Sequence, residues 1–174
     1  MNGLKRTVAL VGMMGAGKSA VGKRLAAKLG VPFRDADEEI EAAAGCTVSE
    51  IFERFGELAF RDGERKVIAR LLGEAPHVLA TGGGAFINDK TRARIKADAM
   101  SVWIRVSLDT LVARVGRRDT RPLLRTGNPR EILENLLKER EPIYAQADLI
   151  VDSEDGPHTS AVEKILSELR GTAA

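Results

Sequence analysis

A lysine and a serine that follow a run of glycines have the residue types and the spacing needed to bind phosphate. The eight residues that start at position 12, G-M-M-G-A-G-K-S, match the pattern G-x-x-x-x-G-K-[ST] at every fixed position. Gly12, Gly15 and Gly17 allow positive φ, so that successive backbone N–H groups can approach an anion at a helix N-terminus. Lys18 adds a point charge for the β- and γ-phosphates, and the Ser19 hydroxyl is a ligand for Mg²⁺. We interpret the segment as a phosphate-binding loop; the alternative is a glycine-rich turn with a chance lysine.

Two carboxylates lie two residues apart at the end of the next expected strand, residues 31–35. Asp35 and Asp37 can both point into the crevice where open α/β sheets bind ligands. Like charges so close together favour a cation or a hydroxyl group as partner. The alternative for Asp37 is an ordinary N-cap before the acidic first turn of a helix.

Two further motifs lie in the middle of the chain. Arg61 and Glu64 are three residues apart in an expected helix, which by itself predicts only a surface ion pair. Three consecutive glycines, 82–84, directly follow an apolar run. Glycines at the end of a strand remove side chains where two backbones, or a backbone and a ligand, come very close. A flexible hairpin tip is the alternative.

Residues 116–127 show neither strand nor helix periodicity and contain four arginines. An irregular loop of this length inside a compact domain usually has a function, most often as a lid. Arginine is abundant between Arg105 and Arg140, which suggests a local anionic ligand, although a solvated charged face is the better interpretation for most of these arginines individually.

The elements that must position these residues alternate regularly along the chain. Five apolar runs, each followed by a helical pattern, predict a parallel sheet covered by helices on both faces, a three-layer α/β/α fold with right-handed crossovers. The expected strands are 7–11, 31–35, 78–81, 101–106 and 148–152, and the expected helices are 18–29, 38–44, a helix capped by Thr47 and interrupted at Gly56, 57–72, 88–97, 108–115, a helix that starts at 128, and 159–170.

The same patterns make three finer predictions. Leu58 is expected on the apolar stripe of the helix 57–72. Pro142 is expected to kink or end its helix near Arg140. His77 and His158 are expected to be exposed structural histidines, because both stand beside proline in loop-like contexts.

Composition excludes several classes of function. The 174 residues leave room for one domain, and a hydrophobic content of 44% is enough for a core. The 27 basic and 25 acidic residues nearly balance, so no general field draws the chain to nucleic acid or to a membrane. Cys46 stands alone, which excludes an intramolecular disulfide and a cysteine metal cluster. With no apolar signal segment at the N-terminus, we expect a cytoplasmic protein.

Taken together, the motifs resemble those of a known family, shikimate kinase, which belongs to the nucleoside-monophosphate-kinase-like P-loop group. The resemblance extends from position 7 to about 169, and the joint order and spacing of the motifs make it specific. The matching segments are the phosphate loop at Gly12–Ser19, F-x-D-x-D at Phe33–Asp37, F-R-x-x-E at Phe60–Glu64, the triple glycine at Gly82–Gly84, R-P-L-L at Arg121–Leu124 and R-x-P-x-Y at Arg140–Tyr144.

The resemblance implies a fold and an activity. The fold would be a single P-loop kinase domain over residues 1–174, with a five-stranded parallel sheet, an acceptor-binding region at about 35–64 and a lid at about 116–128. The activity would be ATP- and Mg²⁺-dependent phosphorylation of the 3-hydroxyl of shikimate, in chorismate and aromatic amino acid biosynthesis. Small kinases of this kind need no partner chain to complete the site, so we expect a monomer.

On the acceptor side, the resemblance implies that the shikimate carboxylate lies between the guanidinium groups of Arg61 and Arg140, whose planar forks suit it. Asp37 would contact the reacting hydroxyl and orient it or accept its proton. Glu64 would fix Arg61. The implied shikimate-binding residues are Asp37, Arg61, Gly82, Gly83, Gly84 and Arg140.

On the nucleotide side, Lys18 and Arg121 would join Asp37 as the catalytic residues, with Arg121 on the lid bridging the phosphates and stabilising transition-state charge. Asp35 would serve Mg²⁺ through water beside Ser19. The implied ATP-binding residues are Gly12, Gly15, Ala16, Gly17, Lys18, Ser19, Ala20, Arg121 and, on the two faces of the adenine, Arg114 and Pro157.

Two alternatives remain at this stage. A gluconate kinase or a nucleotide kinase shares the phosphate loop and the lid, and differs in the acceptor pocket. A non-catalytic nucleotide-binding module is a different class, but the chain lacks the N-K-x-D element typical of guanine-selecting switches.

Overall fold

Five short segments pair into one parallel sheet in the order β2-β3-β1-β4-β5. The computed structural model describes residues 3–115, 128–153 and 159–172. The expected α/β fold with a five-stranded parallel sheet is confirmed. The strands are β1 (Thr7–Val11), β2 (Phe33–Asp35), β3 (Val78–Ala80), β4 (Ala99–Arg105) and β5 (Leu149–Asp152).

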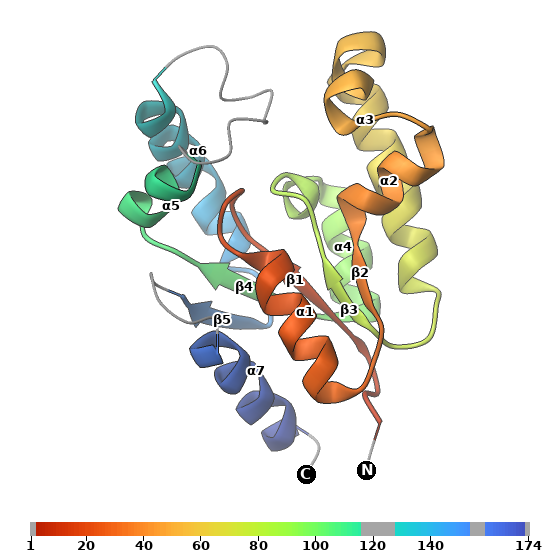
Figure 1. The fold of residues 1–174 in the computed structure, drawn as a ribbon, viewed down its shortest axis with the longest axis vertical. Helices are drawn as coiled ribbons and strands as arrows, with labels where there is room; N and C mark the ends of the chain where they lie inside the picture. The colour runs from red at the N-terminus through yellow and green to blue at the C-terminus, as the bar shows by residue number, and fades with distance from the viewer. Residues whose placement is uncertain (1–2, 116–127, 154–158, 173–174) are drawn as a thin grey trace.

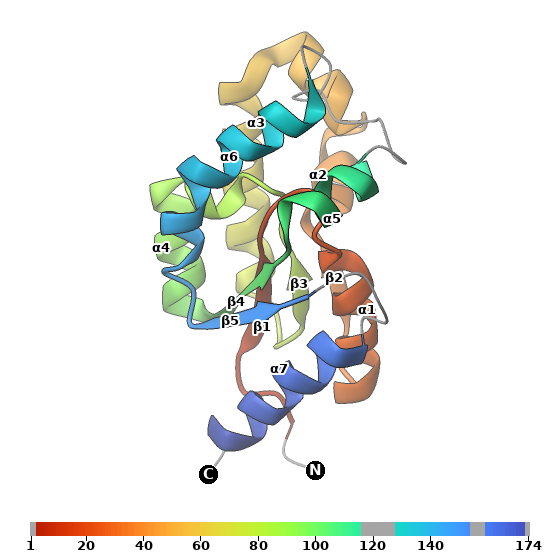
Figure 2. The same cartoon turned by 90° about the vertical axis from the view of Figure 1, so that its left-hand side faces the viewer.

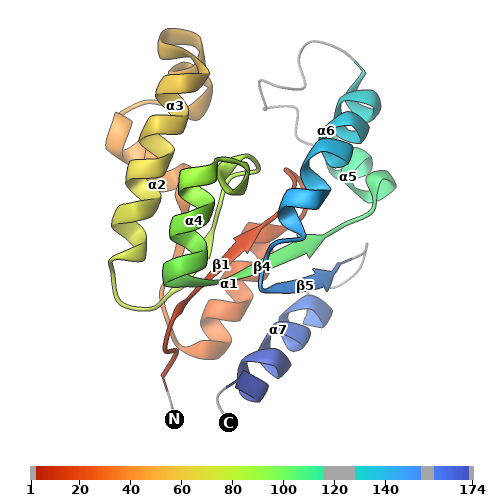
Figure 3. The ribbon, with the colours of Figure 1, turned by 180° about the vertical axis from the view of Figure 1, so that it is seen from behind.

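Helices cover both faces of this sheet. Helices α1 and α7 lie on the face turned to the viewer in Figure 1, and α4 and α6 lie on the face seen in Figure 3. Viewed from the side in Figure 2, α3 and α6 extend beyond the carboxyl ends of the strands. The helices are α1 (Lys18–Leu29), α2 (Ala36–Ala44), α3 (Val48–Leu72), α4 (Asp89–Asp98), α5 (Leu108–Val115), α6 (Pro129–Tyr144) and α7 (Thr159–Thr172), with a 3₁₀ turn η1 (Ala85–Ile87).

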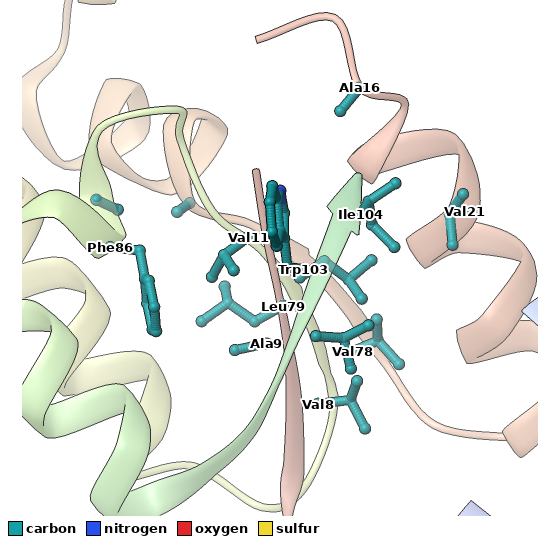
Figure 4. Close-up of a cluster of buried hydrophobic side chains, with 14 of the residues drawn as sticks. Val8, Ala9, Val11, Ala16, Val21, Val78, Leu79, Phe86, Trp103 and Ile104 are labelled. Carbon is teal, nitrogen blue, oxygen red and sulfur yellow. The ribbon is translucent and has the colours of Figure 1, made fainter. Parts of the chain in front are cut away.

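The core explains why the central strands β1 and β3 are buried along their whole length instead of alternating between buried and exposed positions. Val8 and Val78 point towards Val21 of α1, whereas Ala9 and Leu79 point towards the opposite face (Figure 4). All five side chains are fully buried. Strands β2 and β3 lie on one side of β1, and β4 and β5 lie on the other, so the strand order reverses at β1. Open α/β folds bind ligands at the carboxyl ends of the strands next to such a reversal.

The first turn of α2 differs from the expectation. The helix begins at Ala36, because Asp35 is its N-cap and accepts hydrogen bonds from the backbone N–H groups of Asp37 (3.0 Å) and Glu38 (3.3 Å). The capping function that we considered for Asp37 therefore belongs to Asp35. The side chain of Asp37 is not needed as a cap.

Helix α3 is interrupted at Gly56 as expected, with φ 85° and ψ 174°. The prediction that Leu58 faces the core is wrong, because its side chain is 88% exposed. After the break, Leu58 shares a helix face with Asp62 and Arg65, four and seven residues further on, and both are charged. The opposite face is buried, through Phe60 and the apolar residues that follow it at helical spacing.

The end that we considered for α6 near Arg140 is wrong, and so is the prediction for His77. Helix α6 runs through Pro142 to Tyr144. Pro142 cannot donate a hydrogen bond to the carbonyl of Lys138, but both residues are exposed, so water can reach that carbonyl. His77 is 1% exposed, and its Nδ1 lies 2.9 Å from the carbonyl oxygen of Ala75. It precedes the buried strand β3 and pairs with the start of β1. His158 lies outside the described residues.

Two leucines of α3, Leu58 and Leu71, make the corrected register testable. Leu58→Ala should change the free energy of unfolding by less than about 0.5 kcal/mol, because the side chain is already in water. Leu71→Ala, in the same helix and fully buried, should cost about 2–5 kcal/mol. Chemical denaturation of both variants measures the two values, and similar losses would show that Leu58 packs against the core after all.

Candidate functional site

The loop after β1 has the geometry of an anion cradle. Gly12, Gly15 and Gly17 adopt φ values of 143°, 81° and 92°, which side chains disfavour. Helix α1 starts at Lys18, so its unpaired backbone N–H groups and its dipole face the same space. A Cβ atom at Gly12 would lie 2.8 Å from the carbonyl oxygen of Ile104. The interpretation as a phosphate-binding loop is therefore supported by its conformation.

Two cations hold this loop by its carbonyl groups. Lys18 Nζ donates to the carbonyl oxygens of Gly12 (2.7 Å) and Met13 (2.8 Å). Arg114 Nη1 donates to those of Gly15 (3.1 Å) and Ala16 (3.0 Å). Both positive charges thus lie against the loop, where they favour a bound anion. The stacking of Arg114 on adenine stays a prediction.

The residues expected to serve Mg²⁺ lie together. Ser19 Oγ donates to Asp35 Oδ2 at 2.7 Å, while Asp35 Oδ1 caps α2 and so fixes the carboxylate. A hydroxyl and a carboxylate are hard oxygen donors of the kind Mg²⁺ prefers. Among the described residues, no group of three or more histidines, cysteines or acidic residues could enclose a metal ion. The pair therefore fits an ion that takes most of its ligands from water and phosphate, as Mg²⁺ does.

The turn at Gly82–Gly84 is packed so closely that side chains are excluded. A Cβ atom at Gly82 would lie 2.9 Å from Asp37 Oδ1 and 3.2 Å from Glu64 Oε2. One at Gly84 would lie 2.6 Å from Cζ of Arg61. These distances support the close-approach interpretation and bring Asp37, Glu64 and Arg61 from two helices onto one turn.

The pair formed by Arg61 and Glu64 is not a surface ion pair. Arg61 Nη1 lies 2.8 Å from Glu64 Oε1, and Glu64 is 1% exposed. The other oxygen, Oε2, is buried and has no hydrogen-bond partner within the described part of the chain. Burial raises the pKa of Glu64, and the charge of Asp37 adds to this, although the Arg61 and Arg140 guanidinium groups act in the opposite direction.

A second guanidinium group approaches the turn from α6. Arg140 is 9% exposed, and its Nη1 donates to the carbonyl oxygen of Gly83 at 3.1 Å. Arg61 contacts the neighbouring residue Gly84, so the two guanidinium groups meet the same turn from α3 and α6. This arrangement can bind a small carboxylate by bidentate hydrogen bonds.

One cavity of about 470 Å³ joins the phosphate loop to Asp37 and the glycine turn. Gly84, the last residue of the turn, does not line it, and neither do Arg61 and Arg140, which contact the turn. Three lining residues, Glu38, Thr81 and Val115, belong to no recognised motif and were not predicted from the sequence. The full lining is Gly15, Gly17, Lys18, Ser19, Ala20, Asp35, Asp37, Glu38, Thr81, Gly82, Gly83, Arg114 and Val115.

Two residues of the expected site, Arg121 and Pro157, lie outside the described residues. A larger cavity of about 820 Å³ lies at the amino ends of the strands, between the residues that lead into β1, the end of α1 and the face of α7. None of the described motif residues lines this larger cavity, whereas the phosphate loop and Asp37 line the smaller one. We therefore take the smaller cavity as the candidate site. No helix in the described ranges is long and apolar enough to cross a membrane.

Comparisons with known proteins agree with this assignment. Residues 14–170 match the family model described as Shikimate kinase. A shikimate kinase from Caulobacter vibrioides is 58% identical over 165 residues, which are 95% of this chain and 82% of the relative. The structure of a shikimate kinase from Acinetobacter baumannii in complex with shikimate has a TM-score of 0.93 at 38% identity, covering 96% of this chain and 94% of that one. A gluconokinase from Sinorhizobium meliloti 1021, with a TM-score of 0.62 at 20% identity over 99% and 95% of the two chains, shares the fold alone.

The raised pKa of Glu64 predicts a pH dependence of stability. The folded protein holds the carboxyl proton of Glu64 more tightly than the unfolded chain does, so protonation of Glu64 stabilises the folded state. This contribution to the free energy of unfolding is fully present below pH 4.5, the ordinary pKa of a glutamate, and is lost as the pH rises through the pKa of the folded protein. Glu64→Gln removes the titrating group. The free energy of unfolding of the wild type, minus that of Glu64→Gln, should therefore fall between pH 4.5 and neutral pH.

Glu163→Gln is the matched control, because pairing with Lys28 lowers the pKa of this exposed carboxyl. Its difference should stay constant above pH 4.5 and change only in acid. Denaturant titrations across this range give both curves. A flat or rising difference for Glu64 would contradict the dominance of burial over the neighbouring arginines.

Proposed function

The chain belongs to the shikimate kinase family, and we propose that its smaller cavity holds the phosphates of ATP with Mg²⁺, and that shikimate binds where this cavity reaches Asp37 and the glycine turn, with its carboxylate towards Arg61 and Arg140. The reaction is the phosphorylation of shikimate, at its 3-hydroxyl, to give shikimate 3-phosphate and ADP. The observation that carries the proposal is the single cavity that joins the phosphate loop to Asp37 and the glycine turn. Phosphoryl transfer depends mainly on such positioning and on charge stabilisation.

On the nucleotide side, the backbone N–H groups of the loop and Lys18 bind the phosphates. Ser19 and Asp35 would hold Mg²⁺, directly and through water, and the ion would neutralise charge on the phosphates. Arg121, which lies outside the described residues, would bridge the phosphates and stabilise transition-state charge. Arg114 and Pro157 would contact the adenine, and Pro157 also lies outside the described residues.

On the acceptor side, Arg61 and Arg140 bind the carboxylate, and Gly82–Gly84 provide backbone contacts without steric hindrance. Asp37 contacts the reacting hydroxyl, which it orients or deprotonates; both functions require the carboxylate within hydrogen-bond reach. Glu64 fixes Arg61 through the buried pair at 2.8 Å. A guanidinium pair favours a substrate with an anionic group such as a carboxylate.

We also propose that the chain acts as a single-domain monomer in the cytoplasm, with no nucleic acid or membrane partner. The near balance of charges supports the absence of such partners.

The first test is a coupled assay of ADP release with and without shikimate. ADP formation should depend on added shikimate and on Mg²⁺, and gluconate should not replace shikimate. Shikimate-independent ADP formation would contradict the kinase assignment, and turnover with gluconate would favour the alternative acceptor.

Asp37→Asn tests the contact with the acceptor. The variant should lower kcat by about 10²- to 10⁴-fold, because the amide cannot accept the proton and pairs poorly with the hydroxyl, while ATP binding persists. Glu39→Gln is the matched control, since Glu39 lies in the same helical turn but pairs with Arg70 at 3.1 Å. Steady-state kinetics compare the two, and a kcat for Asp37→Asn within a few-fold of wild type would refute this function of Asp37.

A further inference from the structure

The carbonyl group of Gly83 accepts hydrogen bonds from two buried side chains of α6. Arg140 Nη1 donates to it at 3.1 Å, and the hydroxyl group of Tyr144 donates to the same oxygen. A carbonyl oxygen has two lone pairs, so these donors use its full capacity. Two hydrogen bonds to the carbonyl oxygen of Gly83 therefore connect the glycine turn to α6.

The backbone of the turn leaves this carbonyl available. The carbonyl of Gly82 accepts from the N–H of Ala85 (3.2 Å), and that of Gly84 accepts from Ile87 (3.2 Å), within the start of η1. No such bond engages the carbonyl of Gly83 among the described residues, so side chains must satisfy it. The position of this peptide therefore depends on the two side-chain donors of α6, Arg140 and Tyr144.

Tyr144 is a rigid donor. It is fully buried, and its ring packs against that of Trp103 of β4 with centroids 5.7 Å apart. Burial raises the pKa of its phenol, with the nearby Arg140 and Arg61 charges opposing, so the group keeps its proton. Tyr144 and Arg140 are four residues apart in one helix and so share a face.

We propose that Tyr144 is a positioning residue of the acceptor site, whose hydroxyl holds the Gly83 peptide so that Arg140 can present its guanidinium to the substrate carboxylate. The proposal deepens the proposed function and rests on it. With both donors in place, one N–H of Arg140 is used on Gly83 and four remain for ligands and neighbours. Without the Tyr144 hydroxyl, Arg140 is the only side chain in the described part of the chain that donates a hydrogen bond to the Gly83 carbonyl. The Gly83 peptide and the Arg140 guanidinium can then shift.

The effect is specific for the acceptor. Lys18 and Arg114 hold the phosphate loop through their own bonds, none of which passes through Tyr144. Loss of the Tyr144 hydroxyl should therefore weaken the binding of shikimate and leave that of ATP unchanged. A purely structural function of Tyr144 would lower stability without this distinction.

Tyr144→Phe is the test, because it removes the hydroxyl and keeps the ring on Trp103. The KM and the calorimetric Kd for shikimate should rise about five- to twenty-fold, while kcat and the KM for ATP change less than about two-fold. Thr7→Val is the matched control: it also removes one buried hydroxyl bonded to backbone, at the N–H of His77 (3.3 Å), far from the site. It should lower Tm similarly without changing the Kd for shikimate.

A double-mutant cycle with Arg140→Lys tests whether Tyr144 acts through Arg140. In that background, where no bidentate fork remains to be positioned, Tyr144→Phe should raise the Kd less than about two-fold further. Effects that simply multiply, or a Tyr144→Phe protein that binds shikimate like wild type, would overturn the inference and leave the kinase activity standing. Failure of the proposed function itself would appear in the wild type, as absence of shikimate-dependent ADP release, and the inference would fall with it.

Discussion

The site depends on one steric constraint, the absence of side chains in the turn Gly82–Gly84. Each of the three positions is closely approached: Gly82 by two carboxylates, Gly83 by the phosphate loop and Arg140, and Gly84 by Arg61. The backbone N–H of Met14 would lie 3.3 Å from a Cβ atom at Gly83. The same three residues thus set the distance between the phosphate loop and the acceptor groups, and larger residues would separate them.

The buried charges around this turn are arranged for geometry at a cost in stability. Glu64 loses its hydration, and one of its oxygens has no hydrogen-bond partner among the residues that the structure describes; the ion pair with Arg61 only partly offsets this cost. Replacing such a pair with apolar side chains often stabilises a protein. Its retention at this place is understandable because a fixed guanidinium group recognises a carboxylate, which an apolar side chain cannot do.

Local patterns predicted the fold and much of the site, since the glycine spacing of the phosphate loop and the apolar runs of the strands act within a few residues of chain. The cap at Thr47 and the break at Gly56 were predictable for the same reason. The errors have tertiary causes. The register of Leu58 is set by how α3 restarts, His77 is buried by its pairing with β1, and the hydrogen bond of Tyr144 joins residues 61 positions apart. The periodicity of a sequence does not show such long-range contacts. The motif R-x-P-x-Y did, however, include Arg140 and Tyr144, the two residues of α6 that contact the glycine turn.

The larger cavity at the amino ends of the strands has a practical consequence. It is lined both by residues that lead into β1, Gly3–Arg6, and by Leu169 and Arg170 of α7, so the two ends of the described fold lie side by side. The phosphate loop and the glycine turn open at the opposite, carboxyl edge of the sheet (Figure 1). A tag, a fused domain or a solid support attached near either end of the described fold would therefore lie at the amino ends of the strands, away from the smaller cavity. The molecule could then be immobilised with this cavity facing the solution.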